Sequence, residues 1–375
     1  MKIVNGIYTS ANIFTDNIDE YALAQIQQLC DQEALKGCKI RVMPDVHPGK
    51  VATIGLTTTL GNQILPNLIG IDIGCGVTLA RIKAKKVEFQ KLDKVIRGQI
   101  PSGFSIRKKP HRFCEDFDFS ELYCKKAIMQ EKAELSLGTL GSGNHFIELD
   151  QDKEGNLYAV IHSGSRHLGQ EVTEYYLKEG YRLLKSQGVQ VPYELTWLEG
   201  DLMEAYLHDL LIVQEFAALN RECILDELAK GMKWKLEEVY SSVHNYVDTS
   251  QTEKILRKGA ISAKAGEKVI IPVNMRDGII LGEGLGNAQW NHSAPHGAGR
   301  IMNRKDVCTG YTVAQFKAEM KGIYSSCIGK ETLDEAPFAY RHLEEIQEQI
   351  TETVKIQQII RPVYNYKAGN SQSEH

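Results

Sequence analysis

The sequence lacks the features of a membrane protein or of a disulfide-stabilised one. No run approaches the roughly 20 apolar residues that a membrane-spanning helix needs. The first residues also lack a basic stretch followed by an apolar one. None of the eight cysteines stands in a Cys-x-x-Cys pair. We therefore expect reduced, mostly buried thiols in a cytoplasmic protein without a membrane partner.

A surplus of positive charge is also absent, because 44 lysines and arginines face 48 aspartates and glutamates, for a formal net charge of −4. A nucleic-acid partner would therefore have to be held by a local basic patch, since no overall positive field attracts it. The chain further lacks a long flexible linker and an internal repeat. We expect residues 1–375 to form a single α+β domain with a frayed polar tail over 369–375.

Hydrophobic periodicity predicts the order of helices and strands. Helices are expected over residues 19–35, 121–137, 170–186, 200–239 and 340–359. Strands are expected from short apolar runs within 39–84 and at 145–149, 158–162, 241–244 and 268–271. The glycine-rich stretch 278–299 is predicted to be mostly loop, and 362–367 to be extended.

What the chain does contain is a set of six metal-type side chains in five short glycine-rich blocks. They are Asp72, Cys75, His145, His162, His244 and His296. Six candidates exceed what one tetrahedral ion requires, and a shared thiolate lets two ions lie side by side. The mixture of thiolate, carboxylate and imidazole suits Mn, Zn, Fe or Co. Taken singly, each residue is explained as well by a buried thiol or a satisfied structural histidine.

Groups suited to phosphate accompany these side chains. Asn144 precedes His145 in a glycine-rich segment whose backbone N–H groups can form an anion nest. Arg166 closes a His-Ser-Gly-Ser-Arg block, and a guanidinium binds phosphate bidentately. His296 opens a His-Gly-Ala-Gly-Arg turn and can present Nε2 to a phosphorus atom while backbone amides hold the phosphate oxygens. Hydrolase, phosphoesterase and nucleotidyl transferase chemistry all remain open on these residues.

Taken in order, the motifs resemble those of the RtcB family of RNA-splicing ligases. They are Met43 to Gly49, Pro66-Asn67 with Ile71 to Gly76, Gly141 to Phe146, His162 to Arg166, His244-Asn245, and Ser293 to Arg300. The likeness extends from about residue 40 to Lys367. It implies an RtcB-like α+β fold, in which helices flank central β-sheets around a cleft with two metal ions.

The resemblance also implies a reaction. Two Mn²⁺ ions would share the Cys75 thiolate, and the other ligands would divide into two pairs, Asp72 with His145 and His162 with His244. His296 would attack the α-phosphate of GTP, release pyrophosphate and form a covalent guanylyl-histidine. The guanylyl group would pass to an RNA 3′-phosphate, which can arise from a 2′,3′-cyclic phosphate. A 5′-hydroxyl end would then displace GMP and seal the strand, in RNA repair or tRNA splicing.

By the same resemblance, several segments would contact the nucleotide. The candidates are Asn144, His145, Phe146, Ile147, Glu148, His244, Asn245, Pro272, Val273, Asn274, Met275, His296, Gly297, Ala298, Gly299 and Lys367. A carboxylate such as Glu148 suits the N1–H and exocyclic amine of guanine, which would explain a preference for GTP over ATP. Arg166, Asn220 and Arg221 are candidates for supporting an RNA phosphate or the metal site. For Asn220 and Arg221, a helix-surface charge or a buried ion pair is nearly as good an explanation.

One segment departs from the family pattern. Typical members have Pro-Gly-Ser-Met-Gly followed by a base-contacting serine, whereas this chain has Pro272-Val273-Asn274-Met275-Arg276 and Ile279 at the serine position. Such a chain is similar to a divergent short subgroup found with a release-factor-like protein, and we expect a monomer. Two alternatives stay open. One is a metal-dependent cyclic phosphodiesterase that processes RNA ends without sealing, and the other is a non-catalytic RNA- or GTP-binding relative.

Overall fold

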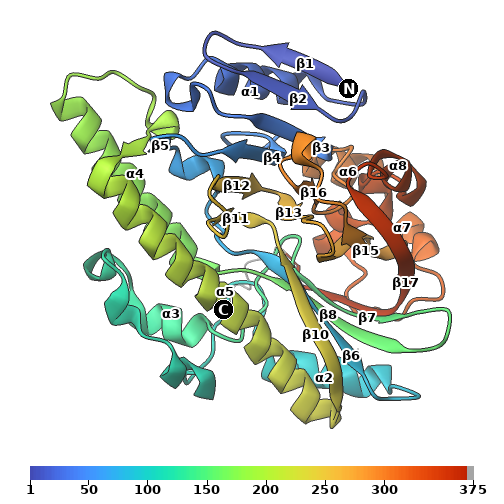
Figure 1. Ribbon diagram of the computed structural model, residues 1–375. Helices are drawn as coiled ribbons and strands as arrows, with labels where there is room; N and C mark the ends of the chain where they lie inside the picture. Colours follow the sequence, from blue (N-terminus) through green and yellow to red (C-terminus); the bar gives the residue numbers. More distant parts are fainter. Residues whose placement is uncertain (370–375) are drawn as a thin grey trace.

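The computed structural model describes residues 1–369, in which helices surround two β-sheets (Figure 1). The α+β class expected from the sequence is confirmed. Of the predicted frayed tail, residues 370–375 lie outside the described residues. Within residues 1–369, no helix is both long and apolar enough to cross a membrane.

The first sheet contains the N-terminal strands. Its order is β1 (Lys2–Asn5), β2 (Ser10–Ile13), β3 (Ile40–His47), β4 (Ile54–Thr59), β12 (Ile255–Lys258) and β11 (Asn245–Asp248). Neighbouring strands are antiparallel except β2 and β3, which are parallel. Helix α1 (Glu20–Cys30) begins at Asp19, whose carboxylate accepts the N–H groups of Tyr21 and Ala22. Its apolar side chains Ile26 and Leu29 are buried in the core of this sheet.

The second sheet is antiparallel throughout and is curled. Its order is β10 (Leu236–Val243), β6 (Gly76–Ile82), β8 (Leu157–Ser163), β7 (Phe146–Gln151), β17 (Val354–Lys367), β15 (Gly278–Gly284) and β14 (Lys268–Asn274). The two edge strands approach each other, because the N–H of Ile270 in β14 donates to Ser242 Oγ in β10 at 3.1 Å. Apolar side chains from both ends of the sheet, such as Val160 and Ile279, share one core inside the curl.

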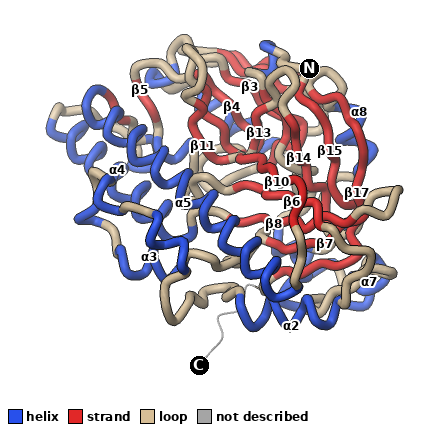
Figure 2. Tube along the Cα trace, turned by 60° about the horizontal axis from the view of Figure 1, so that its bottom comes forward, coloured by secondary structure: helices blue, strands red, loops and turns tan. Residues whose placement is uncertain are grey.

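Two long helices, α4 (Arg166–Ser186) and α5 (Gly200–Met232), lie together along one side of the sheets, and α3 (Gln130–Ser136) lies beyond them (Figure 2). Helix α2 (Phe89–Gln99) packs with α5 against the outer face of the curled sheet, where Leu92 and Leu228 share a core with Ile161. The remaining elements are α6 (Arg304–Gly310), α7 (Val313–Glu319), α8 (Leu343–Gln349) and the short strand pairs β5 (Gln63–Ile64) with β9 (Leu198–Glu199) and β13 (Ala260–Ser262) with β16 (Ser293–Pro295).

Both sheets combine strands from the two halves of the chain. Strands β11 and β12 complete the sheet that β1 to β4 begin, and β14, β15 and β17 complete the sheet of β6 to β8. Neither half could therefore form its sheet alone. On this ground we propose that residues 1–369 form one domain.

Several sequence-based expectations are wrong about secondary structure. The helix expected over 340–359 is only α8, and strand β17 begins at Val354. The loop expected over 278–299 contains β15 and β16, and of the helix expected over 121–137 only α3 is α-helical. Helix α5 ends at Met232, because Lys233 takes a left-handed conformation with φ of 59°. Buried on both faces, β15 lacks the alternation of apolar and polar residues that marks a strand.

Candidate active site

The six metal-type side chains come from strand ends and loops that meet between the two sheets. Asp72 and Cys75 lie before β6, His145 before β7, His162 in β8, His244 between β10 and β11, and His296 just after β16. Strands β6, β8 and β7 are neighbours, and their register pairs His162 with Val77 on one side and with Phe146 on the other. The loops that carry Cys75 and His145 therefore end beside His162.

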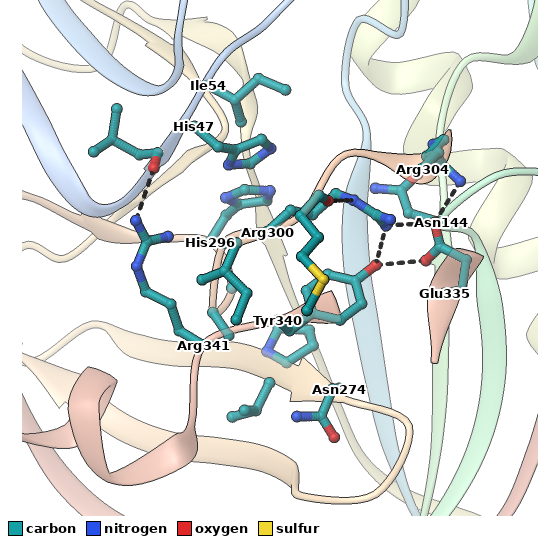
Figure 3. A pocket seen from close by; sticks show the side chains of 18 of the residues that line it. His47, Ile54, Asn144, Asn274, His296, Arg300, Arg304, Glu335, Tyr340 and Arg341 are labelled. Atoms are coloured by element: carbon teal, nitrogen blue, oxygen red, sulfur yellow. Dashed lines mark hydrogen bonds and ion pairs between the residues drawn. The ribbon is translucent and has the colours of Figure 1, made fainter. Parts of the chain in front are cut away.

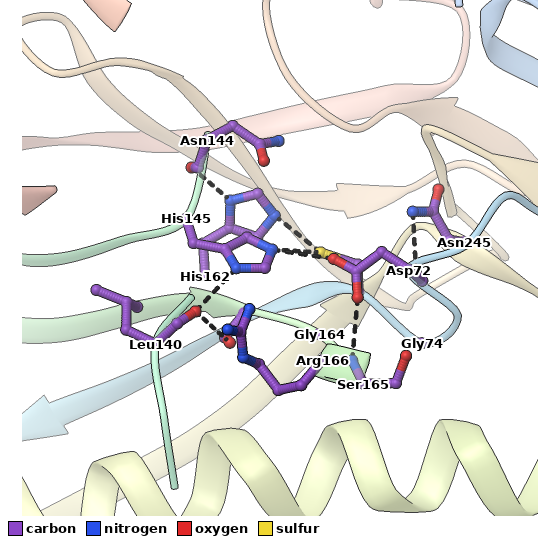
Figure 4. Close-up of polar contacts among 12 residues, drawn as sticks. Asp72, Gly74, Leu140, Asn144, His145, His162, Gly164, Ser165, Arg166 and Asn245 are labelled. Atoms are coloured by element: carbon purple, nitrogen blue, oxygen red, sulfur yellow. Dashed lines mark hydrogen bonds and ion pairs between the residues drawn. The ribbon is translucent and has the colours of Figure 1, made fainter. Parts of the chain in front are cut away.

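Asp72, Cys75, His145, His162 and His244 form one cluster, of which Asp72, His145 and His162 are labelled in Figure 4. Cys75 Sγ lies 3.4 Å from His145 Nε2 and 3.3 Å from His162 Nε2. His162 Nε2 lies 3.3 Å from His244 Nε2, and His145 Nε2 lies 3.0 Å from Asp72 Oδ2. Two groups that could each hold an ion thus share the Cys75 thiol, and the donor atoms of each group lie within 4.8 Å of one another.

The imidazoles are oriented as metal ligands usually are. His145 Nδ1 lies 2.8 Å from Leu140 O, and His162 Nδ1 lies 3.1 Å from Asn144 O. A carbonyl can only accept, so each Nδ1 carries the hydrogen and each Nε2 lone pair faces the cluster. Burial lowers the pKa of His162 and of His244 well below the ordinary value, which keeps these rings neutral. The donor set therefore fits a transition metal.

The acidic ligands are held by their surroundings. Burial raises the pKa of Asp72, but in the absence of metal the neighbouring His145 outweighs burial and brings this pKa to about 2. The N–H of Ser165 also donates to Asp72 Oδ1 at 3.1 Å. Burial and the neighbouring Asp72 raise the pKa of Cys75 well above that of an ordinary thiol. Bound metal would favour the thiolate, because coordination and deprotonation are coupled.

The three polar residues proposed as support lie behind the cluster. Arg221 is buried and donates through Nη1 to Gly74 O at 2.8 Å and to Ser163 O at 2.9 Å. Asn220 is buried too, and its Oδ1 accepts the N–H of Gly138 at 2.7 Å. Both residues brace the loops that carry the ligands, and neither lines the main cavity described below.

The guanidinium of Arg166 also hydrogen-bonds to other residues of the protein. Its Nε donates to Thr139 Oγ1 at 3.1 Å, and its Nη2 donates to Gly103 O at 3.1 Å. Its backbone is left-handed, with φ of 56°. The guanidinium therefore joins the metal cluster to the loop at Gly103.

A cavity of about 1050 Å³ opens over the cluster, and His162 and His244 line it. His296 lines it too, together with Arg300, Glu335 and Tyr340 (Figure 3). His296 Nδ1 lies 2.7 Å from Asp45 Oδ2, and the backbone N–H of His296 donates to the same oxygen at 3.2 Å. Asp45 is fully buried. A carboxylate that accepts from Nδ1–H favours the tautomer whose lone pair is on Nε2, which is the tautomer a nucleophile needs.

Sequence analysis assigned no role to Asp45, although the residue lies in one of the quoted motifs. A signal was present, because Asp45 lies within the strand of apolar residues Ile40–His47. A carboxylate in such a strand is expected to be buried and therefore to need a partner. The identity of the partner could not be read from the sequence, since His296 is 251 positions away.

Most of the predicted nucleotide contacts line the cavity. They are Asn144, Phe146, Glu148, His244, Pro272 to Met275, His296 to Gly299, and Lys367. His145, Ile147 and Asn245 do not line it. Ile147 points to the outer face of the curled sheet, because successive strand residues alternate. Asn245 donates to Asp72 O at 3.1 Å and accepts the N–H of Gly259 at 3.0 Å, so its amide fixes a ligand loop.

A charged cluster forms one wall of the cavity, and of its members only Lys367 was predicted as a site residue. The buried carboxylate of Glu335 accepts from Lys367 Nζ at 2.7 Å, Arg300 Nη1 at 3.1 Å and Tyr340 OH at 2.6 Å. Arg304 Nη1 lies 2.7 Å from the same carboxylate. Burial raises the pKa of Glu335, but Lys367, Arg304 and Arg300 together lower it to about 2. Arg304 also pairs with Asp334, so three cations face two carboxylates on this wall.

Glu148 lines the same cavity, but its pKa is shifted in the opposite direction from that of Glu335. Burial raises its pKa to about 7, and the hydrogen bond from Asn365 and the charge of Lys367 only partly oppose this effect. Asn365 Nδ2 donates to Glu148 Oε1. The carboxyl of Glu148 is therefore poised between its neutral and charged forms near neutral pH.

The segment that departs from the family pattern is part of the core. Val273 lies in β14 and is buried, as is Ile279 in β15. Asn274 lines the cavity, but its Oδ1 accepts the N–H groups of Arg276 and Asp277 at 2.9 Å each. Ile279 therefore offers a base neither a hydroxyl nor an exposed edge.

Known proteins are similar in sequence to this chain over most of its length. A family model described as tRNA-splicing ligase RtcB matches residues 28–368. The RNA-splicing ligase RtcB of Escherichia coli K12 is 29% identical, over 86% of this chain and 88% of that protein. The RNA-splicing ligase RtcB1 of another Escherichia coli strain is 28% identical over the same shares. The tRNA-splicing ligase RtcB of Pyrobaculum aerophilum is 27% identical over 82% of each chain.

Proposed function

Because the chain belongs to the RtcB family of tRNA-splicing ligases, we propose that it is a GTP- and Mn²⁺-dependent RNA ligase. In this proposal it joins an RNA 3′-phosphate or 2′,3′-cyclic phosphate end to a 5′-hydroxyl end through a guanylyl group on His296. RNA ligation itself is the activity named for the relatives in both bacteria and archaea. The names of these relatives do not specify the metal, the nucleotide or the covalent intermediate, which are our proposal.

The observation that carries the proposal is the pairing of His296 with Asp45 over the metal-type cluster. The ring centroids of His296 and His244 lie 4.8 Å apart, so the nucleophile stands beside a metal-type side chain. Bound in the cluster, two Mn²⁺ ions would polarise a phosphoryl oxygen and offset the charge that develops on it. A nucleophile, a charge-stabilising centre and a nucleotide-sized cavity thus lie together.

The residues of the chain account for the first step. His296 Nε2 forms a bond to the α-phosphorus of GTP, the bond from that phosphorus to the β-phosphate oxygen breaks, and pyrophosphate leaves. The attached ring becomes cationic, and Asp45 stabilises it through the Nδ1–H hydrogen bond. In the second step an oxygen of the RNA 3′-phosphate displaces His296 from that phosphorus, which returns the ring to its neutral state.

The third step seals the strand. The RNA 5′-hydroxyl forms a bond to the RNA 3′-phosphorus and loses its proton, while GMP leaves. The guanine base would be read by Glu148 through N1–H and the exocyclic amine, and by Lys367 through O6. Lys367 is held for this contact by Glu335, at 2.7 Å.

The test is labelling with α-labelled GTP and Mn²⁺. The protein should take up an acid-labile label with the properties of a phosphoramidate, and His296→Ala should take up none. A matched control is His208→Ala, because His208 is part-exposed on helix α5 and lies outside the cavity. Label that persists in His296→Ala would show that another residue is the nucleophile.

A cyclic phosphodiesterase that does not seal is the second candidate. It is favoured by one observation, the burial of Ile279 where a base-contacting serine is expected. Product analysis on a nicked RNA separates the two, since sealing yields joined strands and the second candidate yields only 3′-phosphate ends. For the cell we propose a cytoplasmic monomer that acts in RNA repair or tRNA splicing with a release-factor-like protein. The similarity to the short subgroup supports this assignment.

A further inference from the structure

A second cavity of about 790 Å³ lies beside the candidate active site. It is formed by the loop 102–105, the segment 326–332 and the end of strand β17. Lys367 lines both this cavity and the main one, so the two adjoin at this residue.

The floor of this second cavity is bonded directly to the loop that carries a metal-type ligand. The N–H of Gly103 donates to Gly141 O at 2.8 Å, and that of Leu140 donates to Pro101 O at 2.9 Å. Leu140 O in turn accepts from His145 Nδ1 at 2.8 Å. These hydrogen bonds connect the loop that lines the second cavity to the loop that carries His145.

The lining has the residue types that hold unpaired bases. Phe104 is 71% exposed, although it belongs to a loop that is otherwise anchored. Arg97 also lines the cavity, but its guanidinium lies 5.2 Å from the ring centroid of the buried Tyr366 and pairs with Asp93, so Phe104 is the aromatic side chain open to a base. Every base has a π-face, so exposed aromatic side chains bind single strands with little preference for sequence.

The charge around the cavity suits a phosphate backbone. Lys330 lines it and is exposed, and Lys108 and Lys109 are exposed on the adjoining loop. None of these three lysines takes part in an ion pair within residues 1–369. The cavity lining holds one carboxylate, that of Glu331. The other cations of the lining, Arg97 and Lys367, pair with Asp93 and Glu335, so Lys330 and the two lysines of the adjoining loop are the charges that can meet an RNA phosphate.

We propose that the second cavity binds single-stranded RNA a short distance from the ends being joined, with a base on Phe104 and the backbone near Lys330 and Lys108. The inference rests on the proposed RNA ligase function. It assigns to the loop 102–109 a role in substrate affinity that is separate from the chemistry at His296. The nucleotide site needs no contact from this loop, so the two can be tested separately.

The experiment is equilibrium binding of a single-stranded RNA with a 3′-phosphate, followed by fluorescence anisotropy without GTP. Phe104→Ala should raise the Kd about tenfold, the loss expected of one stacked base. The double variant Lys108→Glu with Lys330→Glu should weaken binding further and reduce the slope of log Kd against log salt concentration. With RNA too short to reach the second cavity, Phe104→Ala and the wild type should bind equally.

Two matched controls lie away from both cavities. Tyr123→Ala removes an aromatic side chain that is 66% exposed, and Lys36→Glu reverses an exposed lysine. Neither should change the Kd. Equal Kd values for Phe104→Ala and Tyr123→Ala would overturn the docking proposal. Labelling from GTP is a separate readout. If Phe104→Ala is labelled normally and binds RNA as the wild type does, only the docking proposal is refuted. If the wild type takes up no label but Phe104→Ala binds RNA more weakly than the wild type, the ligase proposal is refuted and the RNA site is supported.

Discussion

His296 and Asp45 are 251 positions apart in the sequence, and their side chains meet at 2.7 Å between Nδ1 and Oδ2. Asp45 is fully buried, whereas the side chain of His296 is 15% exposed and lines the cavity. The carboxylate therefore acts from inside the protein on a ring that faces the substrate.

Asp45→Asn should lower the rate of guanylylation by a factor on the order of 10³, because an amide that donates to Nδ1 favours the wrong tautomer of the ring. Thermal unfolding and manganese content should stay close to those of the wild type. The rate is measured as label from GTP per unit time. A rate within threefold of the wild type would mean that Asp45 does not orient the nucleophile.

The sharing of Cys75 predicts an unequal effect of ligand substitutions. Cys75→Ala should abolish the binding of both manganese ions, whereas Asp72→Ala and His244→Ala should each mainly remove one, because each of these residues belongs to a single group. Metal analysis after dialysis gives the stoichiometry. Cys308→Ala, at an exposed cysteine, is the control and should bind as the wild type does. Equal losses in all three ligand variants would contradict a shared thiolate.

Glu148 predicts a dependence of stability on pH. Burial raises its pKa from 4.5 to about 7, so between these values the folded protein holds a proton that the unfolded chain has released. The free energy of unfolding should therefore fall as pH rises through this window. Burial and the charge of Glu148 also raise the pKa of Asp150, so Glu148→Gln should flatten the profile without abolishing its slope in denaturant titrations with a chelator present. Parallel profiles for the two proteins would refute the assignment.

Ile279 is predicted to serve the core and not the base. Ile279→Ser should lower the free energy of unfolding by about 3 kcal/mol, because it opens a cavity and buries a hydroxyl without a partner. The KM for GTP should change little at a temperature where the variant is folded. A tighter KM for GTP in this variant would indicate that the serine position contacts the base after all.

The sequence correctly predicted features that depend on residues close together in the chain. The glycine-flanked blocks around Asp72, Cys75 and His162 identified residues that do lie together, because strand ends and tight turns present their side chains at sheet edges. Helices α4 and α5 were also found, since their helical spacing is long and uninterrupted by proline.

What the sequence did not predict depends on long-range packing. The strand β15 was read as loop because both of its faces are buried, and the first part of β17, residues 354–359, was read as helix because its apolar residues also fit a helical period. The rest of β17, over 362–367, was expected to be extended and is. The partners of Glu335 come from three separate segments, so nothing local marks it. Asn245 was assigned to the nucleotide, although its amide bonds to the backbone of Asp72 and Gly259.

A crystal structure of the protein with GTP and Mn²⁺ would test the central claim most directly. We predict two metal ions on either side of Cys75 Sγ, and a covalent bond from His296 Nε2 to the phosphorus of GMP. Metal ions bound away from Cys75, or a nucleotide whose α-phosphate lies out of reach of His296, would contradict the account.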